Sequence, residues 1–330
     1  MYMKIKTNSV WIYAVAAAMM AAVSCAKDDA PTADNNILRF VAGLGPQTMA
    51  PIESDDNGLV TSGTITGIQI WRGRYGSTPR FNRLESVTCR TASLDGTGIL
   101  TLNDTLNINT DGSTANFLGF YPLGSLDFGT ETTPATVTYT IDGETDIIAA
   151  NRVSKTYSAS DNTVNLAFKH QLARLRFRCV CVDDANGALY QGISEAKIKV
   201  PKKAVMIIPD NGIITTVGKM SDPIVDSDYT ELNFGTCEMS QEGEYAKKDL
   251  MILPDDALAP VDVIQHMQIG LKFAGFPDDA IRQYSLNNLK LVAGKTTTIT
   301  VTVSGAEPLT ISTTIEAWNA VDTGQGWVTE

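Results

Sequence analysis

The sequence has few of the residues on which metal centres and phosphate-binding surfaces depend. Of its 330 residues only two are histidines, His170 and His266. Two imidazoles are too few for most zinc sites and leave few groups for proton transfer near neutral pH. Lysine and arginine number 26 against 37 acidic residues, which gives a net charge of −11. Because an acidic chain repels phosphate backbones, the composition argues against a nucleic-acid partner.

Recognisable catalytic motifs are also missing. The sequence contains no Gly-rich phosphate loop, nucleophile elbow or zinc-binding helix motif. Its carboxylate pairs could act as calcium ligands or glycosidase acids, but each stands near Gly, Pro or Asn in an expected turn. The pairs are Asp28-Asp29, Asp55-Asp56, Asp183-Asp184, Asp255-Asp256 and Asp278-Asp279. We favour solvated loop residues, and we predict no enzyme activity, no cofactor and no metal site.

The N-terminus carries an export signal. Lys4 and Lys6 precede an uncharged apolar run over residues 10–23, which is too short to span a bilayer but suits a signal peptide. Small residues then lead into Cys25, in a pattern that resembles a bacterial lipobox. We therefore predict a lipoprotein signal peptide over residues 1–24 and acylation of Cys25. The alternative is an ordinary signal peptide followed by a chance cysteine.

A polar segment follows the lipobox. Lys27, Asp28 and Asp29 resemble the surface-export signal of Bacteroidetes lipoproteins, and Pro31 disfavours regular structure. We predict a flexible tether over residues 25–36, whether or not the export signal operates. These segments place the expected protein on the outer membrane, lipid-anchored and facing the cell surface.

The rest of the chain has the pattern of an all-β protein. Apolar and polar residues alternate with period two from residue 37 onward, in short runs bounded by Gly, Asn, Asp and Pro. Outside the signal peptide no helical period exceeds about two turns. This pattern is typical of β-sandwiches, and the length suits two of them. We predict an N-terminal sandwich over residues 37–182 and a C-terminal sandwich over residues 183–330.

The longest strand-like run covers residues 164–182. Its apolar side chains occupy even positions up to Leu172 and odd positions from Leu175, so Ala173-Arg174 requires a bulge or a crossing between sheets. His170 falls on the apolar face, which favours a core or domain-interface residue over a general base. Cys179 and Cys181 share one face and are expected to be buried small apolar residues rather than metal ligands.

Several motifs resemble those of Bacteroidales fimbrillin-like proteins. The central one is VNLAFKHQLARLRF, residues 164–177. The others are GFYP at residues 119–122, DIIAA at 146–150, LVAGK at 291–295, TIEAW at 314–318 and GQGW at 324–327. Their order and spacing cover nearly the whole mature chain, and the lipobox agrees with the resemblance.

The resemblance implies two tandem transthyretin-like β-sandwich domains and a role in a type V fimbrium, as a stalk, anchor, tip or accessory subunit. In that family an arginine-directed protease removes the first strand of the lipidated precursor. The groove so opened accepts a strand from the next subunit, and this head-to-tail contact builds a fibre. The implied partners are other fimbrial subunits, the outer membrane, and a ligand on a host or bacterial surface.

The removable first strand corresponds here to residues 37–42, with Leu38, Phe40 and Ala42 on one face. The family's Thr-Arg cleavage pair stands here as Thr48-Met49, and no Arg or Lys occurs between Arg39 and Arg72. Arg39 and Met49 are the candidate processing positions, but a cut at Arg39 would leave most of the strand in place. A subunit that keeps this strand would suit an anchor, tip or accessory role, or would need another protease.

The C-terminal strand is the candidate donor. Its alternating residues are Leu309, Ile311, Thr313 and Ile315. The alternative is that this segment is simply the last strand of the second sandwich.

A second hypothesis is a surface carbohydrate-binding lipoprotein. It would use exposed aromatic residues such as Trp71 or Trp327 as a platform on which sugar rings stack. Single tryptophans near strand ends more commonly pack in a core or at an edge.

Overall fold

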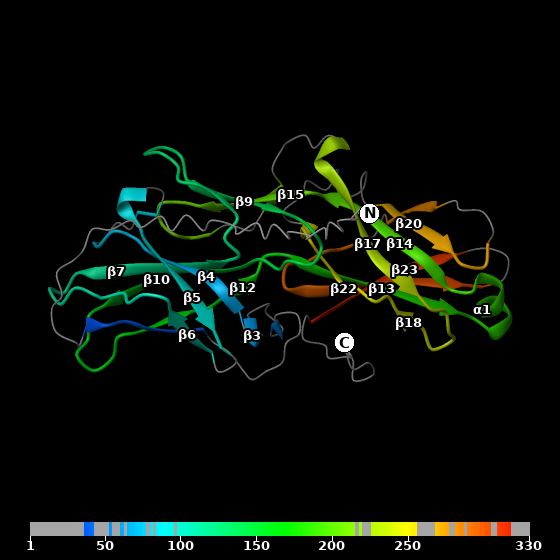
Figure 1. The fold of residues 1–330 in the computed structure, drawn as a ribbon, viewed down its shortest axis with the longest axis horizontal. Coiled ribbons are helices and arrows are strands. Elements are labelled where there is room, and N and C mark those ends of the chain that lie inside the picture. The colour runs from blue at the N-terminus through cyan, green and yellow to red at the C-terminus, as the bar shows by residue number, and fades with distance from the viewer. Residues whose placement is uncertain are drawn as a thin grey trace, which may run out of the picture.

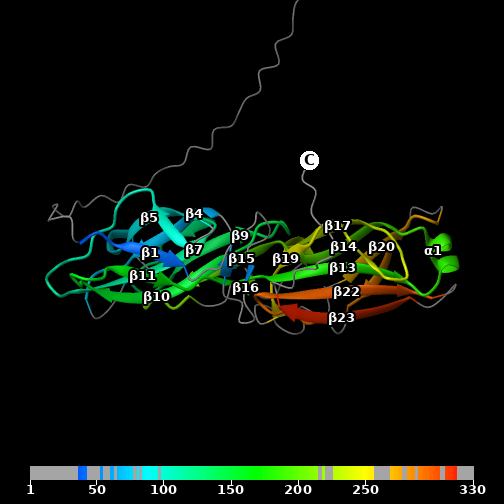
Figure 2. The same ribbon diagram turned by 90° about the horizontal axis from the view of Figure 1, so that it is seen from below.

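The protein is nearly all β-structure and elongated, with two halves arranged along its long axis (Figures 1 and 2). The computed structural model describes residues 36–42, 53–54, 60–62, 65–76, 80–81, 84–95, 98–214, 218–219, 226–255, 268–276, 281–286, 289–304 and 309–317. The prediction of an all-β fold is confirmed. The signal peptide and the tether lie outside the described residues, except for Asn36.

The first half is built on an eight-stranded sheet. In spatial order its strands are β11 (Thr163–Leu166), β1 (Arg39–Ala42), β6 (Ile99–Leu102), β5 (Thr88–Leu94), β4 (Ile65–Arg72), β7 (Thr114–Tyr121), β10 (Ile148–Thr156) and β12 (Lys169–His170). Strand β11 at one edge also contacts β10 and β7 near the other edge. The sheet therefore curls round a core of its own, which includes Phe40, Phe117 and Phe168.

A four-stranded sheet covers the outer face of this curled sheet. Its strands, in order, are β16 (Gly218–Lys219), β15 (Lys203–Ile208), β9 (Ala135–Thr140) and β8 (Ser125–Asp127). Both faces of β7 are consequently buried, with Phe117 in the inner core and Leu118 and Phe120 in the outer one. This explains the continuous apolar run that the sequence has there.

The second half is a sandwich of two sheets. One contains β18 (Glu244–Tyr245), β13 (Ala173–Cys181), β22 (Lys295–Val303) and β23 (Thr310–Ala317) in that order, with β19 (Leu250–Ile252) also paired to β13. The other contains β17 (Tyr229–Cys237), β14 (Ile193–Pro201), β20 (Gln268–Phe273) and β21 (Arg282–Ser285). Phe177 and Phe234 meet between them, with ring centroids 5.5 Å apart.

The remaining described elements are short. They are the pair β2 (Glu53–Ser54) and β3 (Val60–Ser62), the 3-10 turns η2 (Leu84–Ser86) and η3 (Asp226–Asp228), and the helix α1 (Asp184–Tyr190). Asp183 caps α1, since its carboxylate accepts a hydrogen bond from the Asn186 N–H at 2.8 Å. Among the described helices, none has the length and apolar character needed to traverse a bilayer.

The parity change at Ala173-Arg174 is a crossing between sheets. β12 pairs with β10 in the eight-stranded sheet, whereas β13 begins at Ala173 in the second half. Arg174, Arg176 and Arg178 then occupy the face of β13 opposite to the core, as the alternation predicts.

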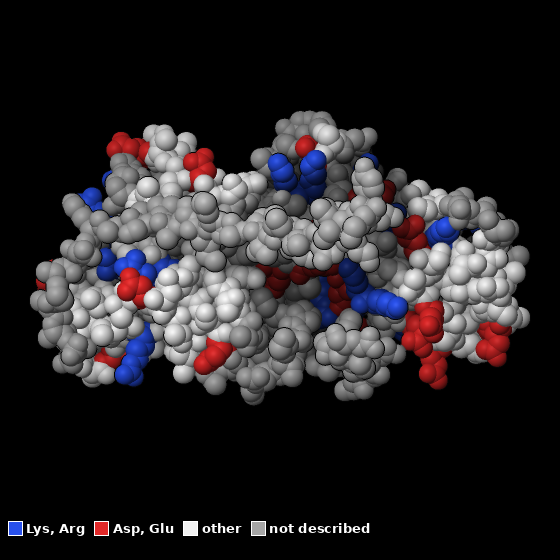
Figure 3. All heavy atoms as spheres, viewed as in Figure 1, with Lys and Arg blue, Asp and Glu red and all other residues white. Residues whose placement is uncertain are grey.

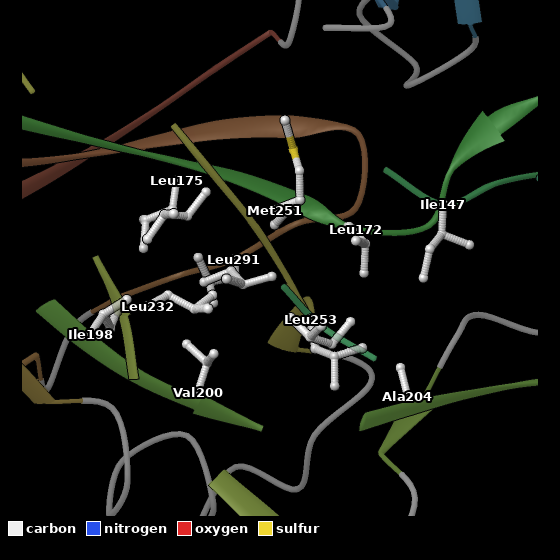
Figure 4. Close-up of a cluster of buried hydrophobic side chains, with 14 of the residues drawn as sticks. Ile147, Leu172, Leu175, Ile198, Val200, Ala204, Leu232, Met251, Leu253 and Leu291 are labelled. Carbon is white, nitrogen blue, oxygen red and sulfur yellow. The ribbon is translucent and has the colours of Figure 1, made fainter. Parts of the chain in front are cut away.

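The outer core of the first half continues into the second half. β15, which follows β14 in the chain, pairs along its whole length with β9 of the first half, from Lys203↔Thr140 to Ile208↔Ala135. Figure 4 shows Ile147, Leu172 and Ala204 toward one side of a single cluster and Leu175 and Ile198 toward the other. The two-domain boundary after residue 182 stays a prediction, but these contacts join the segments on either side of it.

Candidate functional site

The candidate site is the slot that β1 occupies in the eight-stranded sheet. β1 runs parallel to β11, with Phe40 opposite Val164, and antiparallel to β6, with Phe40 opposite Leu100. Backbone hydrogen bonds extend the pairing beyond the strand, from the Leu38 N–H to the Leu106 carbonyl at 2.9 Å and from the Ala42 N–H to the Gly98 carbonyl at 2.8 Å. The first described segment of the chain thus closes a gap between two strands that come later in the sequence.

The side chains of β1 fill the inner core of the first half. Leu38, Phe40 and Ala42 are each at most 4% exposed, and the Phe40 ring meets the Phe117 ring edge to face at 5.4 Å. Phe40 lies opposite Leu100 of β6 and Val164 of β11, and Ala42 lies opposite Leu166 of β11. If β1 left, an apolar trough would open between two strands with unpaired backbone groups.

The partners of β1 are candidate functional residues that the sequence analysis did not identify. Leu100, Val164 and Leu166 line the slot and are each at most 4% exposed. Their period-two alternation marks them as core residues, but it carries no information about which strand lies beside them.

The outer side of the slot is open to solvent. A hollow of about 440 Å³ lies along β1 and β6. It is lined by Ile37, Leu38, Arg39, Phe40, Val41, Ile99, Leu100, Leu102, Asp104, Thr105 and Thr163. The Arg39 side chain is exposed there, but its backbone N–H donates to the Asn162 carbonyl at 3.1 Å. A protease that cuts at Arg39 would therefore act on paired backbone.

The turn before β11 fixes one wall of the slot. The Asp161 carboxylate accepts hydrogen bonds from the Thr163 backbone N–H at 2.8 Å and from the Lys155 ammonium at 3.1 Å. Hydrogen bonds from the Thr163 side chain and backbone, followed by the effect of Lys155, lower the pKa of Asp161 to about 2. Thr163 in turn lies opposite Arg39 in the ladder between β1 and β11.

The candidate donor strand, β23, lies in the other half of the molecule, away from β1 (Figure 2). It is the edge strand of its sheet and pairs with β22 from Thr302↔Thr310 to Lys295↔Ala317. Leu309, Ile311 and Thr313 are half-buried and Ile315 is 43% exposed. Leu309, Ile311 and Thr313 alternate with exposed neighbours but Ile315 does not, this face is much less buried than that of β1, and the two strands do not meet within one chain.

Three residues for which the sequence predicts a functional role lie outside the described residues. They are the acylation site Cys25, the candidate processing position Met49, and Trp327 of the carbohydrate hypothesis. Trp71, the other aromatic residue of that hypothesis, is fully buried between Phe120 and Phe128, with ring centroids 5.1 and 5.2 Å away. Trp71 cannot stack on a sugar, so its proposed role in a glycan platform is wrong.

The polar residues considered for catalysis have structural roles where they are described. His170 is 3% exposed, and its Nδ1 lies 2.6 Å from the Asp146 carboxylate. Asp183 caps α1, and Asp255 accepts a hydrogen bond from the Leu291 N–H at 3.0 Å. Within the described ranges, no cluster of three or more His, Cys, Asp or Glu residues is placed to hold a metal ion.

The surface charge is mixed. On the face shown in Figure 3, described basic and acidic side chains lie in small interleaved groups. This face, as far as the described residues show, offers no broad basic track of the kind that follows a phosphate backbone.

Comparison with known proteins identifies the same architecture elsewhere. The sequence profile of the fimbrillin-like family matches residues 55–318. A structure described as a candidate cell adhesion protein from Bacteroides uniformis is 16% identical, with a TM-score of 0.57, over 86% of this chain and 98% of that one. A fimbrial protein from Bacteroides vulgatus is 12% identical, with a TM-score of 0.55, over 86% of this chain and 100% of that one. At these identities the likeness concerns the fold. Among curated proteins, none matches the chain.

Proposed function

The chain belongs to the fimbrillin-like family, and from that premise we propose that it is a subunit of a cell-surface fimbrium that joins neighbouring subunits by exchanging a β-strand. The family assignment supports a fimbrial subunit role and assembly with other fimbrial subunits. The strand exchange, the acylation of Cys25 and the attachment to the outer membrane are parts of the proposal. The proposed role is structural and requires no catalysis.

The observation that carries the proposal is the placement of β1. A strand from the start of the described chain lies between β6 and β11, with Leu38, Phe40 and Ala42 buried in the core. A strand from another subunit could replace it without any other change in strand order, because only its two neighbours pair with it. The profile match to the family begins at residue 55, after this strand.

β23 has the properties expected of a donor. Leu309, Ile311 and Thr313 repeat the i, i+2, i+4 spacing of Leu38, Phe40 and Ala42, so they can enter the same row of pockets. β23 is an edge strand with a half-buried face. On leaving its own sheet it therefore gives up fewer backbone hydrogen bonds and less buried apolar surface than an interior strand would. Main-chain hydrogen bonds to β6 and β11 would then replace those to β22.

The residue at position 49 decides how the slot opens. In this chain the family's Thr-Arg pair is replaced by Thr48-Met49, and no Arg or Lys stands between Arg39 and Arg72. We propose that the chain as encoded retains β1 under an arginine-specific protease. This fits an anchor, tip or accessory position, where a subunit offers a donor strand but does not accept one.

The experiment restores the missing cleavage site. The full chain with Met49→Arg is treated with an arginine-specific protease beside the wild type, and binding of a labelled peptide of residues 309–317 is measured by fluorescence polarisation. We expect the cut Met49→Arg chain to lose β1 and bind the peptide, whereas the treated wild type and the uncut variant do not. A peptide with Ile311→Asp is the matched control and should bind at least tenfold more weakly.

Two results of this experiment would contradict the proposal. If the cut chain has released β1 and still ignores both peptides, strand exchange is wrong. If it binds the Ile311→Asp peptide as well as the native one, pocket recognition is wrong. Size-exclusion chromatography of the cut chain without peptide gives a second measurement, because exchange between copies through their own β23 would produce oligomers.

A further inference from the structure

Two buried cysteines lie next to each other between the sheets of the second half. Cys179 is on β13, in one sheet, and Cys237 ends β17, in the other. Their exposed fractions are 0% and 2%. β13 and β17 contact each other across the core, so the two cysteines face one another from opposite layers.

Glu244 contacts both of these cysteines. It lies directly opposite Cys179 in the antiparallel ladder of β13 and β18, where paired Cα atoms are about 4.5–5.5 Å apart. The Cys237 thiol donates to the carbonyl oxygen of the same Glu244 at 3.1 Å. Burial, and secondarily a hydrogen bond with the Cys237 thiol, raise the pKa of Cys179. The two sulfurs are therefore neighbours.

The other two described cysteines lack this relation. Cys181 is two residues further along β13, and its sulfur lies beside Gly187 of α1, 3.2 Å from where a Cβ on that glycine would stand. Cys89 is half-buried on β5 in the first half. None of these four described cysteines forms a disulfide in the structure.

We propose that Cys179 and Cys237 are a disulfide pair, which cross-links the two sheets of the second half when the chain folds in the presence of an organic disulfide. In this reaction two S–H bonds are lost and one S–S bond forms. The two protons and two electrons pass to the organic disulfide, which leaves as two thiols. The bond would close a loop of about 60 residues and stabilise the sandwich against unfolding.

The bond has to form before the core closes. The thiolate is the attacking species, and the buried Cys179 thiol is hard to ionise in the folded protein. We therefore expect fully folded, reduced protein to oxidise slowly and refolding protein to oxidise readily.

The test is refolding with mapping of the cross-link. Full-length protein recovered in detergent from producing cells is unfolded, reduced, and refolded in a mixture of oxidised and reduced glutathione. It is then alkylated and digested with trypsin without reduction. Because Cys179 and Cys181 share the tryptic peptide of residues 179–197, the Cys181→Ala variant makes the assignment. We expect that peptide to be cross-linked to residues 220–247, which contain Cys237, and the cross-link to vanish in Cys179→Ala.

Thermal unfolding gives an independent readout. In the Cys181→Ala variant we expect reduction to lower the Tm by roughly 5–10 °C, and in Cys179→Ala we expect no such shift. Refolded protein in which Cys179 and Cys237 are both alkylated as free thiols would overturn the proposal, as would a cross-link from Cys181. If the variants do not refold, wild-type protein alkylated during extraction from cells decides, since free Cys237 there contradicts the pair.

Discussion

At the scale of single residues, a charged cluster holds the outer face of β13. The Asp249 carboxylate accepts hydrogen bonds from the Arg174 Nε at 2.6 Å and from the Arg176 Nε at 3.2 Å. Arg176 and Arg178 also lie against the Tyr245 ring, 5.6 and 5.5 Å from its centroid. The residues that follow the crossing from β12 are thus fixed by charge pairing as well as by the core.

We expect Asp249→Ala to destabilise the protein strongly. The side chain of Arg174 is only 7% exposed and that of Asp249 13%, so the substitution leaves a largely buried positive charge without its carboxylate. The free energy of unfolding should fall by about 3 kcal/mol in urea denaturation. Asp104→Ala, which breaks an exposed pair with Arg90, should cost at most about 1 kcal/mol. Equal losses in the two variants would show that the cluster does not stabilise the fold.

Asp161 makes the stability of the fold around the slot for β1 depend on pH. Its pKa is lowered to about 2 in the folded protein, against about 3.9 in an unfolded chain. A lowered pKa means that this carboxylate stabilises the fold above about pH 4 and that the contribution is lost as the pH falls towards 2. In urea denaturation, wild-type protein should lose more stability between pH 4 and pH 2 than Asp161→Asn, which cannot ionise. Parallel acid profiles would contradict this assignment.

Single residues also mark the limit of prediction from sequence. The alternation along residues 164–182 predicts which side chains face the core and places the three arginines opposite. It cannot predict Asp249, which lies 75 positions beyond Arg174 in the chain. Pairing between distant segments depends on strand order, which no local pattern encodes.

At the scale of elements, β1 and β23 differ in how they are held. β1 pairs on both sides and presents buried side chains to the core, whereas β23, among the described strands, pairs with β22 alone and presents half-buried ones. The period-two pattern predicts both as strands and gives the inward residues of β1 correctly, but in β23 the predicted inward residue Ile315 is exposed. It does not predict that β1 runs parallel to β11, because the partner lies more than 100 residues away.

We expect substitutions in these two strands to lower the free energy of unfolding by different amounts. Phe40→Ala removes a ring that is 2% exposed and packed on Phe117, and should lower the free energy of unfolding by about 3–5 kcal/mol. Ile311→Ala removes a half-buried side chain from an edge strand and should cost only about 1 kcal/mol. Both are measured by urea denaturation of the full chain. A loss at Ile311 as large as that at Phe40 would mean that β23 is too firmly packed to serve as a donor.

At the scale of the whole molecule, the turn after β15 fastens the four-stranded sheet to the eight-stranded sheet that it covers. The turn at residues 209–212 closes through the Gly212 N–H and the Pro209 carbonyl at 2.8 Å, and the Gly212 carbonyl accepts from the Arg152 N–H at 2.9 Å. Phe81 packs directly over Gly212, which has a positive φ of 67°. The sequence Pro-Asp-Asn-Gly predicts the turn, but not that it rests on β10 of the eight-stranded sheet.

Gly212→Ala should weaken this fastening. A Cβ there would lie 2.6 Å from the fully buried ring of Phe81, in addition to the strain of a positive φ. Gly112→Ala is the matched control, because Gly112 has a φ of 82° but no atom within 4 Å of the added carbon. In urea denaturation, we expect Gly212→Ala to lower the free energy of unfolding by about 1–3 kcal/mol more than the control does. Equal costs would mean that backbone strain alone matters at both positions.

The ladder between β9 and β15 has a mechanical consequence. Both strands run close to the long axis of the molecule (Figure 1), and hydrogen bonds between antiparallel strands lie perpendicular to the strand direction. Tension applied to the two ends of the molecule would therefore shear the six residue pairs of this ladder together instead of unzipping them in turn. Halves joined only by a linker would stretch at the linker, whereas this molecule passes the force through hydrogen-bonded backbone and extends little before it ruptures.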